Sequence, residues 1–157
     1  MKIVQFEPNM QPQILQFFEK CFAAVNIPFS PKDRHSDIVD IANNYMTNGY
    51  FWCLLENDAI VGTVAIRSLD NKIVELKRLF VLPQYQGKGY GRSLLEYAID
   101  YAKRQQYHKM LLDTRLQFSV ARHLYQSMGF KETDKYNDNI NAELYYELVL
   151  CVTGDQS

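Results

Sequence analysis

One stretch of the chain indicates the fold more clearly than any other, and it reads Glu75-Leu76-Lys77-Arg78-Leu79-Phe80-Val81-Leu82-Pro83-Gln84-Tyr85-Gln86-Gly87-Lys88-Gly89-Tyr90-Gly91. Its first half has the alternating apolar residues of a strand, and its second half has a glycine at every other position. An amphipathic helix follows, because residues 94–102 place their apolar side chains on one face. The stretch therefore predicts a strand that turns sharply into a helix.

The apolar positions change parity within this strand. Val74 and Leu76 share one parity, whereas Leu79 and Val81 share the other. Because neighbouring residues of a strand point to opposite faces, one extra residue must be accommodated if both pairs lie on the same face. We therefore predict a β-bulge near residues 77–78. The alternative is a regular strand whose apolar side chains pack on both faces.

The glycine-rich turn at residues 86–92 predicts a phosphate-binding loop. Gly87, Gly89 and Gly91 allow backbone amides to turn inward, and the helix start offers partial positive charge. Lys88 and Arg92 add full positive charges. The alternative is an ordinary turn in which glycine provides tightness only.

Three kinds of phosphate loop compete for this turn. A Walker loop requires Ser or Thr after Gly-Lys, and Gly89 stands there instead. A dinucleotide fingerprint requires a third glycine where this chain has Arg92, although Asp113 lies where a ribose ligand would be expected. The third kind is the Q/R-x-x-G-x-G/A loop, which residues 86–91 match at every position.

The remaining chain predicts an α/β (α+β) fold. Strands are expected at 2–6, 50–55, 59–68, 72–82, 109–113, 130–136 and 143–150, and helices at 14–22, 38–45, 91–102 and 120–128. The sheet should be mixed and largely antiparallel, with about seven strands, about four flanking helices and a central strand-helix-strand unit. We expect one domain over residues 1–150 and a polar tail over 151–157.

Composition excludes several classes of function. The chain has 157 residues, of which 47% are apolar, and 17 Lys and Arg against 18 Asp and Glu. This balance predicts no nucleic-acid partner, and the absence of a long apolar stretch predicts no membrane insertion. Cys21, Cys53 and Cys151 lack any paired spacing, which favours reduced thiols and a cytoplasmic location. His35, His108 and His123 are scattered, so we expect no metal site.

Two linked motifs resemble those of the GNAT superfamily of N-acetyltransferases. Residues 75–91 resemble its central signature, and Ala121-Arg122-His123-Leu124-Tyr125-Gln126-Ser127-Met128-Gly129-Phe130 resembles its A-x-x-L-Y-x-x-x-G-F segment. The order of elements agrees from residue 2 to residue 150. The resemblance implies acetyl-coenzyme A as co-substrate and transfer of its acetyl group to an amine. Homodimers are common in the family, so the resemblance makes a homodimer possible here, although the sequence itself shows no interface.

The resemblance also implies roles for individual residues. The coenzyme would be bound by Leu79 and Val81 at the bulge and by the loop residues Gln86, Gly87, Lys88, Gly89, Tyr90, Gly91 and Arg92. Tyr125 would act as general acid toward the coenzyme thiolate; the alternative is a packing tyrosine. Glu75 would accept a proton from the ammonium group of the acceptor; the alternative is a solvated or salt-bridged strand residue.

Other aspects of the function stay open at this level. Many relatives have Asn where this chain has Phe118, so pantetheine could instead contact Gln117, Ser119 or backbone groups. The acceptor site is expected in segments 26–48 and 136–139, with Asp33, Arg34, Tyr45 and Asp138 as candidates for binding a small polar amine such as an amino acid. Because no nucleophile is well placed, direct attack in a ternary complex is expected. The alternatives are a non-catalytic acyl-coenzyme A binding module and a dinucleotide-binding domain.

Overall fold

The computed structural model describes residues 1–150, and Cys151 and the predicted polar tail lie outside the described residues. The elements in chain order are β1 (Lys2–Gln5), η1 (Pro8–Met10), α1 (Gln11–Ala24), α2 (Ser36–Val39), α3 (Ile41–Tyr45), β2 (Gly49–Glu56), β3 (Ala59–Ser68), β4 (Ile73–Val81), η2 (Pro83–Tyr85), α4 (Tyr90–Arg104), β5 (Lys109–Thr114), α5 (Ser119–Ser127), β6 (Lys131–Glu132) and β7 (Leu144–Val149). The η elements are short 3-10 helices.

The strands form one mixed sheet in the order β1-β2-β3-β4-β5-β7-β6. Only β4 and β5 pair in parallel, and every other neighbouring pair is antiparallel. The predicted seven-stranded, largely antiparallel sheet is therefore confirmed. Among the residues that the structure describes, no helix combines the length and apolar character needed to cross a membrane.

The structure corrects two predicted elements. The single helix expected over 38–45 is two short helices, because Asp40 leaves the helical conformation and its carboxylate caps α3 at the Asn43 N–H. Residues 1–150 thus contain five α-helices rather than about four. The strand expected over 130–136 is reduced to β6. After one more hydrogen bond to β7, from the Thr133 N–H to the Tyr145 carbonyl, the chain leaves the sheet and lines the cavity described below.

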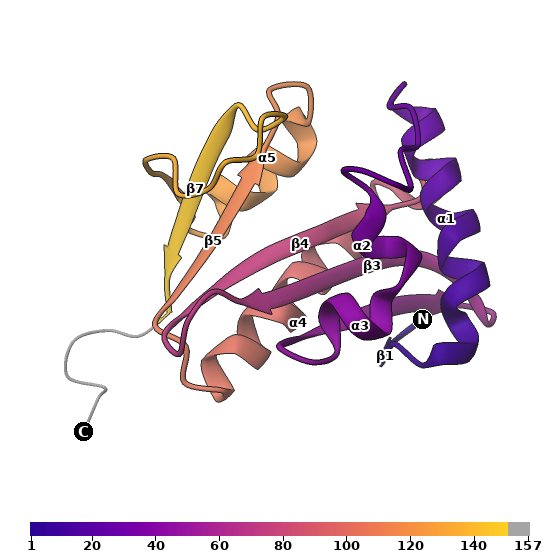
Figure 1. The fold of residues 1–157 in the computed structure, drawn as a ribbon, viewed down its shortest axis with the longest axis horizontal. Coiled ribbons are helices and arrows are strands. Elements are labelled where there is room, and N and C mark those ends of the chain that lie inside the picture. The colour runs from indigo at the N-terminus through magenta and orange to yellow at the C-terminus, as the bar shows by residue number, and fades with distance from the viewer. Residues whose placement is uncertain (151–157) are drawn as a thin grey trace.

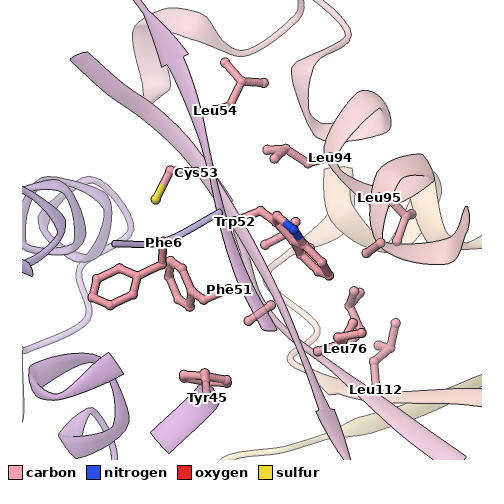
Figure 2. Packing of buried hydrophobic residues seen from close by; sticks show 14 of the residues in the cluster. Phe6, Tyr45, Phe51, Trp52, Cys53, Leu54, Leu76, Leu94, Leu95 and Leu112 are labelled. Atoms are coloured by element: carbon pink, nitrogen blue, oxygen red, sulfur yellow. The ribbon is translucent and has the colours of Figure 1, made fainter. Parts of the chain in front are cut away.

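Helices cover both faces of the sheet. Helices α1, α2 and α3 lie on one face of β2 and β3, and α4 lies on the other (Figure 1). The alternation of β2 explains this: Phe51 points toward Phe6 and Tyr45, while Trp52 points toward Leu94 and Leu95 (Figure 2). All six of these side chains are buried. Both faces of the central strands therefore contribute to the core.

The predicted bulge in β4 is confirmed. Ala65 of β3 pairs with Lys77, but Thr63 pairs with Phe80, so β4 contains one extra residue between these pairs. Arg78 occupies this position with a φ of 54°, in the left-handed region. The Thr63 hydroxyl donates a hydrogen bond of 2.8 Å to the Arg78 carbonyl oxygen, which satisfies a backbone group that the bulge releases from the ladder.

The side chain of the bulge residue joins β4 to α2. Arg78 donates two hydrogen bonds to Asp37, of 2.7 and 2.9 Å, and a third of 3.0 Å to the Arg34 carbonyl oxygen. The Tyr45 hydroxyl donates to the same carboxylate at 2.5 Å. Burial alone would raise the pKa of Asp37, but the hydrogen bonds and charge of Arg78 outweigh burial and lower this pKa.

We predict that Asp37→Asn lowers the free energy of unfolding by about 3 kcal/mol at pH 7, because Arg78 is left without its anionic partner. Since the folded-state pKa of Asp37 is below its ordinary value of 3.8, the contribution is complete above pH 3.8 and is lost as the pH falls through the lower folded-state pKa. Urea unfolding at several pH values measures both effects. Exposed Asp33→Asn is the control. An equal loss at pH 7 and pH 2 would contradict the assignment.

Candidate active site

A cavity of about 780 Å³ opens where β4 and β5 separate. The two strands pair only from Ile73 to Glu75 and from Lys109 to Leu111. Beyond this point the cavity is lined by β4, β5, α1, α5, the chain before α2 and the loop 133–143. Its volume lies in the range of small-molecule sites. Because the cavity interrupts the sheet, it exposes backbone groups as well as side chains.

The edge of β4 that faces this cavity offers backbone donors. The Leu82 N–H donates to the Val61 carbonyl of β3. Because successive amides of a strand point to opposite edges, the amides of Leu79 and Val81 point to the edge away from β3. Both residues line the cavity. This position suits the role predicted for their amides.

The glycine-rich loop lies at the N-terminus of α4. Gly87 and Gly89 have φ values of 81° and 84°, which side chains rarely adopt, and a Cβ at either position would enter open space. The backbone N–H groups of residues 87–92 donate to no acceptor among the described residues. Unpaired amides at a helix N-terminus suit an anion such as a phosphate group.

Most residues of this loop line the cavity. Gln86, Gly87, Gly89, Tyr90 and Gly91 line the cavity. The Gln86 amide donates to the Val81 carbonyl at 3.1 Å, and the Tyr90 hydroxyl donates to Glu56.

Two of the predicted coenzyme-binding side chains are directed elsewhere. The Lys88 ammonium lies 5.3 Å from the centre of the Tyr85 ring. Arg92 donates to the Ser127 hydroxyl and the Met128 sulfur, both at 3.0 Å. Neither residue lines the cavity, because each has a partner on a neighbouring element.

Tyr125 lies on α5 with only 7% of its surface exposed. It lines the cavity, and its hydroxyl makes no hydrogen bond to another described residue. Burial, followed by the negative charge of Asp113, raises its pKa. The hydroxyl therefore stays protonated and can donate a hydrogen bond, but complete transfer of its proton to a thiolate is less favourable than for an ordinary tyrosine.

Glu75 is buried on β4 and accepts three hydrogen bonds. The Tyr136 hydroxyl donates at 2.6 Å, and the side chains of Asn137 and Arg67 each donate at 3.4 Å. Burial, followed by the charge of Glu75, raises the pKa of Tyr136, so this hydroxyl keeps its proton. The contact with Arg67 also forms an ion pair, so the salt-bridged alternative for Glu75 describes part of its environment.

Asp113 forms a second acidic position in the same cavity. Its two oxygens accept hydrogen bonds from Asn137 at 2.7 Å and from Asn139 at 3.2 Å. Asn137 therefore contacts both carboxylates. Sequence reasoning singled out the 136–139 segment and considered Asp113 as a ribose ligand, but it missed their connection to Glu75. The signal was the run of Asn residues that follows Tyr136.

The predicted acceptor residues are only partly brought together. Arg34 lines the cavity, whereas Asp33, Tyr45 and Asp138 do not. Tyr45 is fully buried against Asp37.

The structure also places His35 and the segment around Phe118. Buried His35 lines the cavity, and its Nδ1 accepts a hydrogen bond of 2.9 Å from the Ser30 N–H. Phe118, Gln117 and Ser119 all line the cavity as well.

Comparison with known proteins identifies the family. Residues 12–130 match the Acetyltransferase (GNAT) family. The chain belongs to this family. It is similar to the N-acetylaspartate synthetase of Danio rerio, with 34% identity over 66% of this chain and 38% of that protein. The chain spans between 38% and 55% of the length of the curated relatives it matches.

Solved structures agree with this family. A GNAT acetyltransferase of Staphylococcus aureus has a TM-score of 0.88 and 25% identity, covering 96% of this chain and 99% of that one. The yncA protein of Salmonella typhimurium, solved with its cofactor acetyl-CoA, has a TM-score of 0.72 and 23% identity, covering 97% and 95%. The mixed sheet and its helices are thus the GNAT fold.

We predict that Gly89→Glu abolishes binding of coenzyme A, because a carboxylate would stand beside the unpaired amides and the positive φ would be strained. Calorimetric titration with coenzyme A measures the affinity. Gln106→Glu is the control, since Gln106 is exposed, has a φ of 67° and does not line the cavity. Unchanged affinity in Gly89→Glu would show that the loop does not hold the phosphates.

Proposed function

We propose that this chain is an N-acetyltransferase that moves the acetyl group of acetyl-coenzyme A to the amine of a small molecule. The unpaired amides of residues 87–92, at one end of a cavity that also contains Tyr125 and Glu75, carry this proposal. Family membership and the acetyl-CoA in a protein of the same fold support the choice of donor. The buried free thiols of Cys21 and Cys53 support a reducing, cytoplasmic location.

Each group of residues has a proposed part in the reaction. The loop 87–92 holds the pyrophosphate of the co-substrate, and the amides of Leu79 and Val81 hold its arm and polarise the thioester carbonyl. Acetyl-coenzyme A supplies the activated acetyl group. Phe118 provides an apolar contact where many relatives have Asn, so backbone groups would take a larger share in holding the arm.

The reaction requires two proton transfers. An acceptor ammonium loses one proton before its nitrogen attacks the thioester carbonyl, and we assign this proton to Glu75. The new C–N bond forms, the C–S bond breaks, and the second nitrogen proton takes the place of the acetyl group on the coenzyme sulfur, which leaves as the thiol. Tyr125 donates a hydrogen bond to the leaving sulfur. Because the pKa of Tyr125 is raised, we propose that its hydroxyl stabilises the leaving thiolate by this hydrogen bond rather than by complete transfer of its proton.

A small acceptor agrees with the partly enclosed cavity. The loop 133–143 is fastened to three separate segments, since its residues contact Glu75 in β4, Asp113 in β5 and Arg34 before α2. The name of the Danio rerio relative, an N-acetylaspartate synthetase, also supports a small molecule. The homodimer expected from the family stays a prediction.

The proposal is tested by titrating the protein with acetyl-coenzyme A, coenzyme A and reduced nicotinamide dinucleotide, followed by thiol release across a panel of amines. Selective binding of coenzyme A with amine-dependent thiol release is the expected result. Binding without release from any amine would indicate a non-catalytic module, and binding of the nicotinamide compound alone would indicate a dinucleotide domain.

We predict that Tyr125→Phe lowers kcat by about 10- to 100-fold, which corresponds to one hydrogen bond to a charged group. The affinity for coenzyme A should change little, because the ring and its packing are kept. Thiol-release assays measure kcat, and calorimetry measures the affinity for coenzyme A. Tyr146→Phe is a matched control, since Tyr146 is buried 6.2 Å from the Tyr125 ring but does not line the cavity. Equal kcat in both variants would remove the role of Tyr125.

We predict that Glu75→Gln lowers kcat/KM by at least about 100-fold at pH 7, where an alkyl ammonium of pKa ~10 is mostly protonated. The loss should shrink as the pH approaches 10, because neutral amine becomes abundant and needs no base. A pH profile of thiol release measures this, with exposed Glu132→Gln as control. A loss that is constant across the pH range would indicate that Glu75 acts through structure alone.

A further inference from the structure

The cavity contains more positive charge than its own acidic groups compensate. Arg67 pairs with Glu75, and Arg78 pairs with Asp37. Three further cations line the cavity without an ion-pair partner among the described residues, and these are Arg34, Lys77 and Arg115. An unpaired cation at a partly enclosed site favours an anionic ligand group.

Arg34 is the best placed of these cations. Its Nη1 donates a hydrogen bond of 3.2 Å to the Asn141 side-chain oxygen, a neutral acceptor. Its Nε is buried and has no hydrogen-bond partner. A buried N–H without a partner is costly, and a guanidinium presents its donors in a fork that matches a carboxylate. A ligand carboxylate in the cavity would therefore give the Arg34 guanidinium an anionic partner, which no described residue supplies.

The backbone of Arg34 is held by the bulge residue of β4. Its carbonyl oxygen accepts the 3.0 Å hydrogen bond from Arg78, the bulge residue of β4. The neighbouring His35 has its pKa lowered to about 4 by burial first and then by the charges of Arg78 and Arg34. His35 is consequently neutral at pH 7, and the positive charge at this end of the cavity comes from the arginines.

A chain of hydrogen bonds connects Arg34 to the two carboxylates. Asn141 contacts Arg34 through its side chain and donates its N–H to Asn139 at 3.0 Å. Asn139 in turn donates its N–H to Asn137 at 3.1 Å, and Asn137 contacts both Glu75 and Asp113. The cationic and anionic groups are therefore arranged along one short loop.

The loop contacts one negatively charged and one positively charged side chain. Asp113 is bound by neutral amides only, so its negative charge is available to an ammonium group. Arg34 is bound by a neutral amide only, so its positive charge is available to an anion. A ligand with both charges would be complementary to the pair.

We propose that the acceptor is a small amino carboxylate, such as a free amino acid, and that Arg34 binds its carboxylate while its amine lies beside Glu75 and Asp113. This inference rests on the proposed transferase function and names its substrate class. Arg34 is then a specificity-determining residue. A peptide N-terminus is the opposing case, because its nearest carboxylate is replaced by an amide.

The test compares acceptors that differ only in the carboxylate. L-alanine, L-phenylalanine and L-lysine are each assayed beside the corresponding amide and the decarboxylated amine, namely ethylamine, phenethylamine and cadaverine. At least one amino acid should exceed its amide and amine in kcat/KM by about 10- to 100-fold, the contribution of a charged hydrogen bond. Arg34→Gln should remove this preference, mainly by raising the KM of the amino acid toward that of its amide. Exposed Lys32→Gln, on the same segment, is the control.

A binding measurement separates this inference from the proposed function. The N-acetyl derivatives of the same amino acids and amines are titrated into the protein saturated with coenzyme A, which requires no turnover. Binding that depends on the carboxylate and on Arg34 supports the inference even if thiol release fails. Equal binding of the acid and amine derivatives would overturn the inference whether or not the chain is a transferase. If the chain does turn over, equal use of amino acids and their amides as acceptors would overturn it as well.

Discussion

One extra residue in β4 constrains most of this structure. Arg78 is accommodated in the left-handed conformation, which shifts the pairing with β3 by one position and directs the amides of Leu79 and Val81 toward the cavity. Its guanidinium is held by Asp37, which joins the sheet to α2. The same side chain supports the carbonyl of Arg34. The backbones of Leu79 and Val81 and the backbone of Arg34 are thus positioned by different parts of one residue.

The electrostatics of the site follow from burial. Glu75 and Asp113 occupy one cavity, and each is stabilised by donors from the loop 133–143. Burial and nearby carboxylates raise the pKa of both Tyr125 and Tyr136, so these hydroxyls act as donors at neutral pH. A site of this kind orients charge with neutral hydrogen-bond donors, which retain their protons while the substrates exchange theirs.

The sequence was most informative where local rules dominate. The parity change between Leu76 and Leu79 predicted the bulge, and the alternate glycines predicted the loop, because both depend on the backbone conformation of a few adjacent residues. The break between α2 and α3 at Asp40 was missed, because the apolar residues keep helical spacing across it while the Asp40 side chain caps a new helix. The early end of β6 at Glu132 was missed because a strand pattern does not reveal where pairing with the neighbouring strand stops.

Contacts between distant segments could not be predicted in this way. The hydrogen bonds from Tyr136 to Glu75 and from Arg34 to Asn141 join residues 61 and 107 positions apart. Lys88 and Arg92 were assigned to the coenzyme from their position in a motif. The Arg92 side chain contacts the end of α5, a partner that only the tertiary structure supplies, whereas Lys88 lies over the ring of Tyr85, three residues earlier in the chain. Whether they contribute to coenzyme binding stays a prediction.

The parallel seam between β4 and β5 has a consequence for self-association. A strand edge with unpaired amides ordinarily invites another chain to add to the sheet, with aggregation as the result. Here the edge of β4 beyond Glu75 lies inside the molecule, flanked by α1 and α5 and covered in part by the loop 133–143. A second polypeptide is kept away by this enclosure, while a slender ligand can enter. Backbone groups that would endanger solubility at the rim of a sheet are thereby made available for binding in its interior.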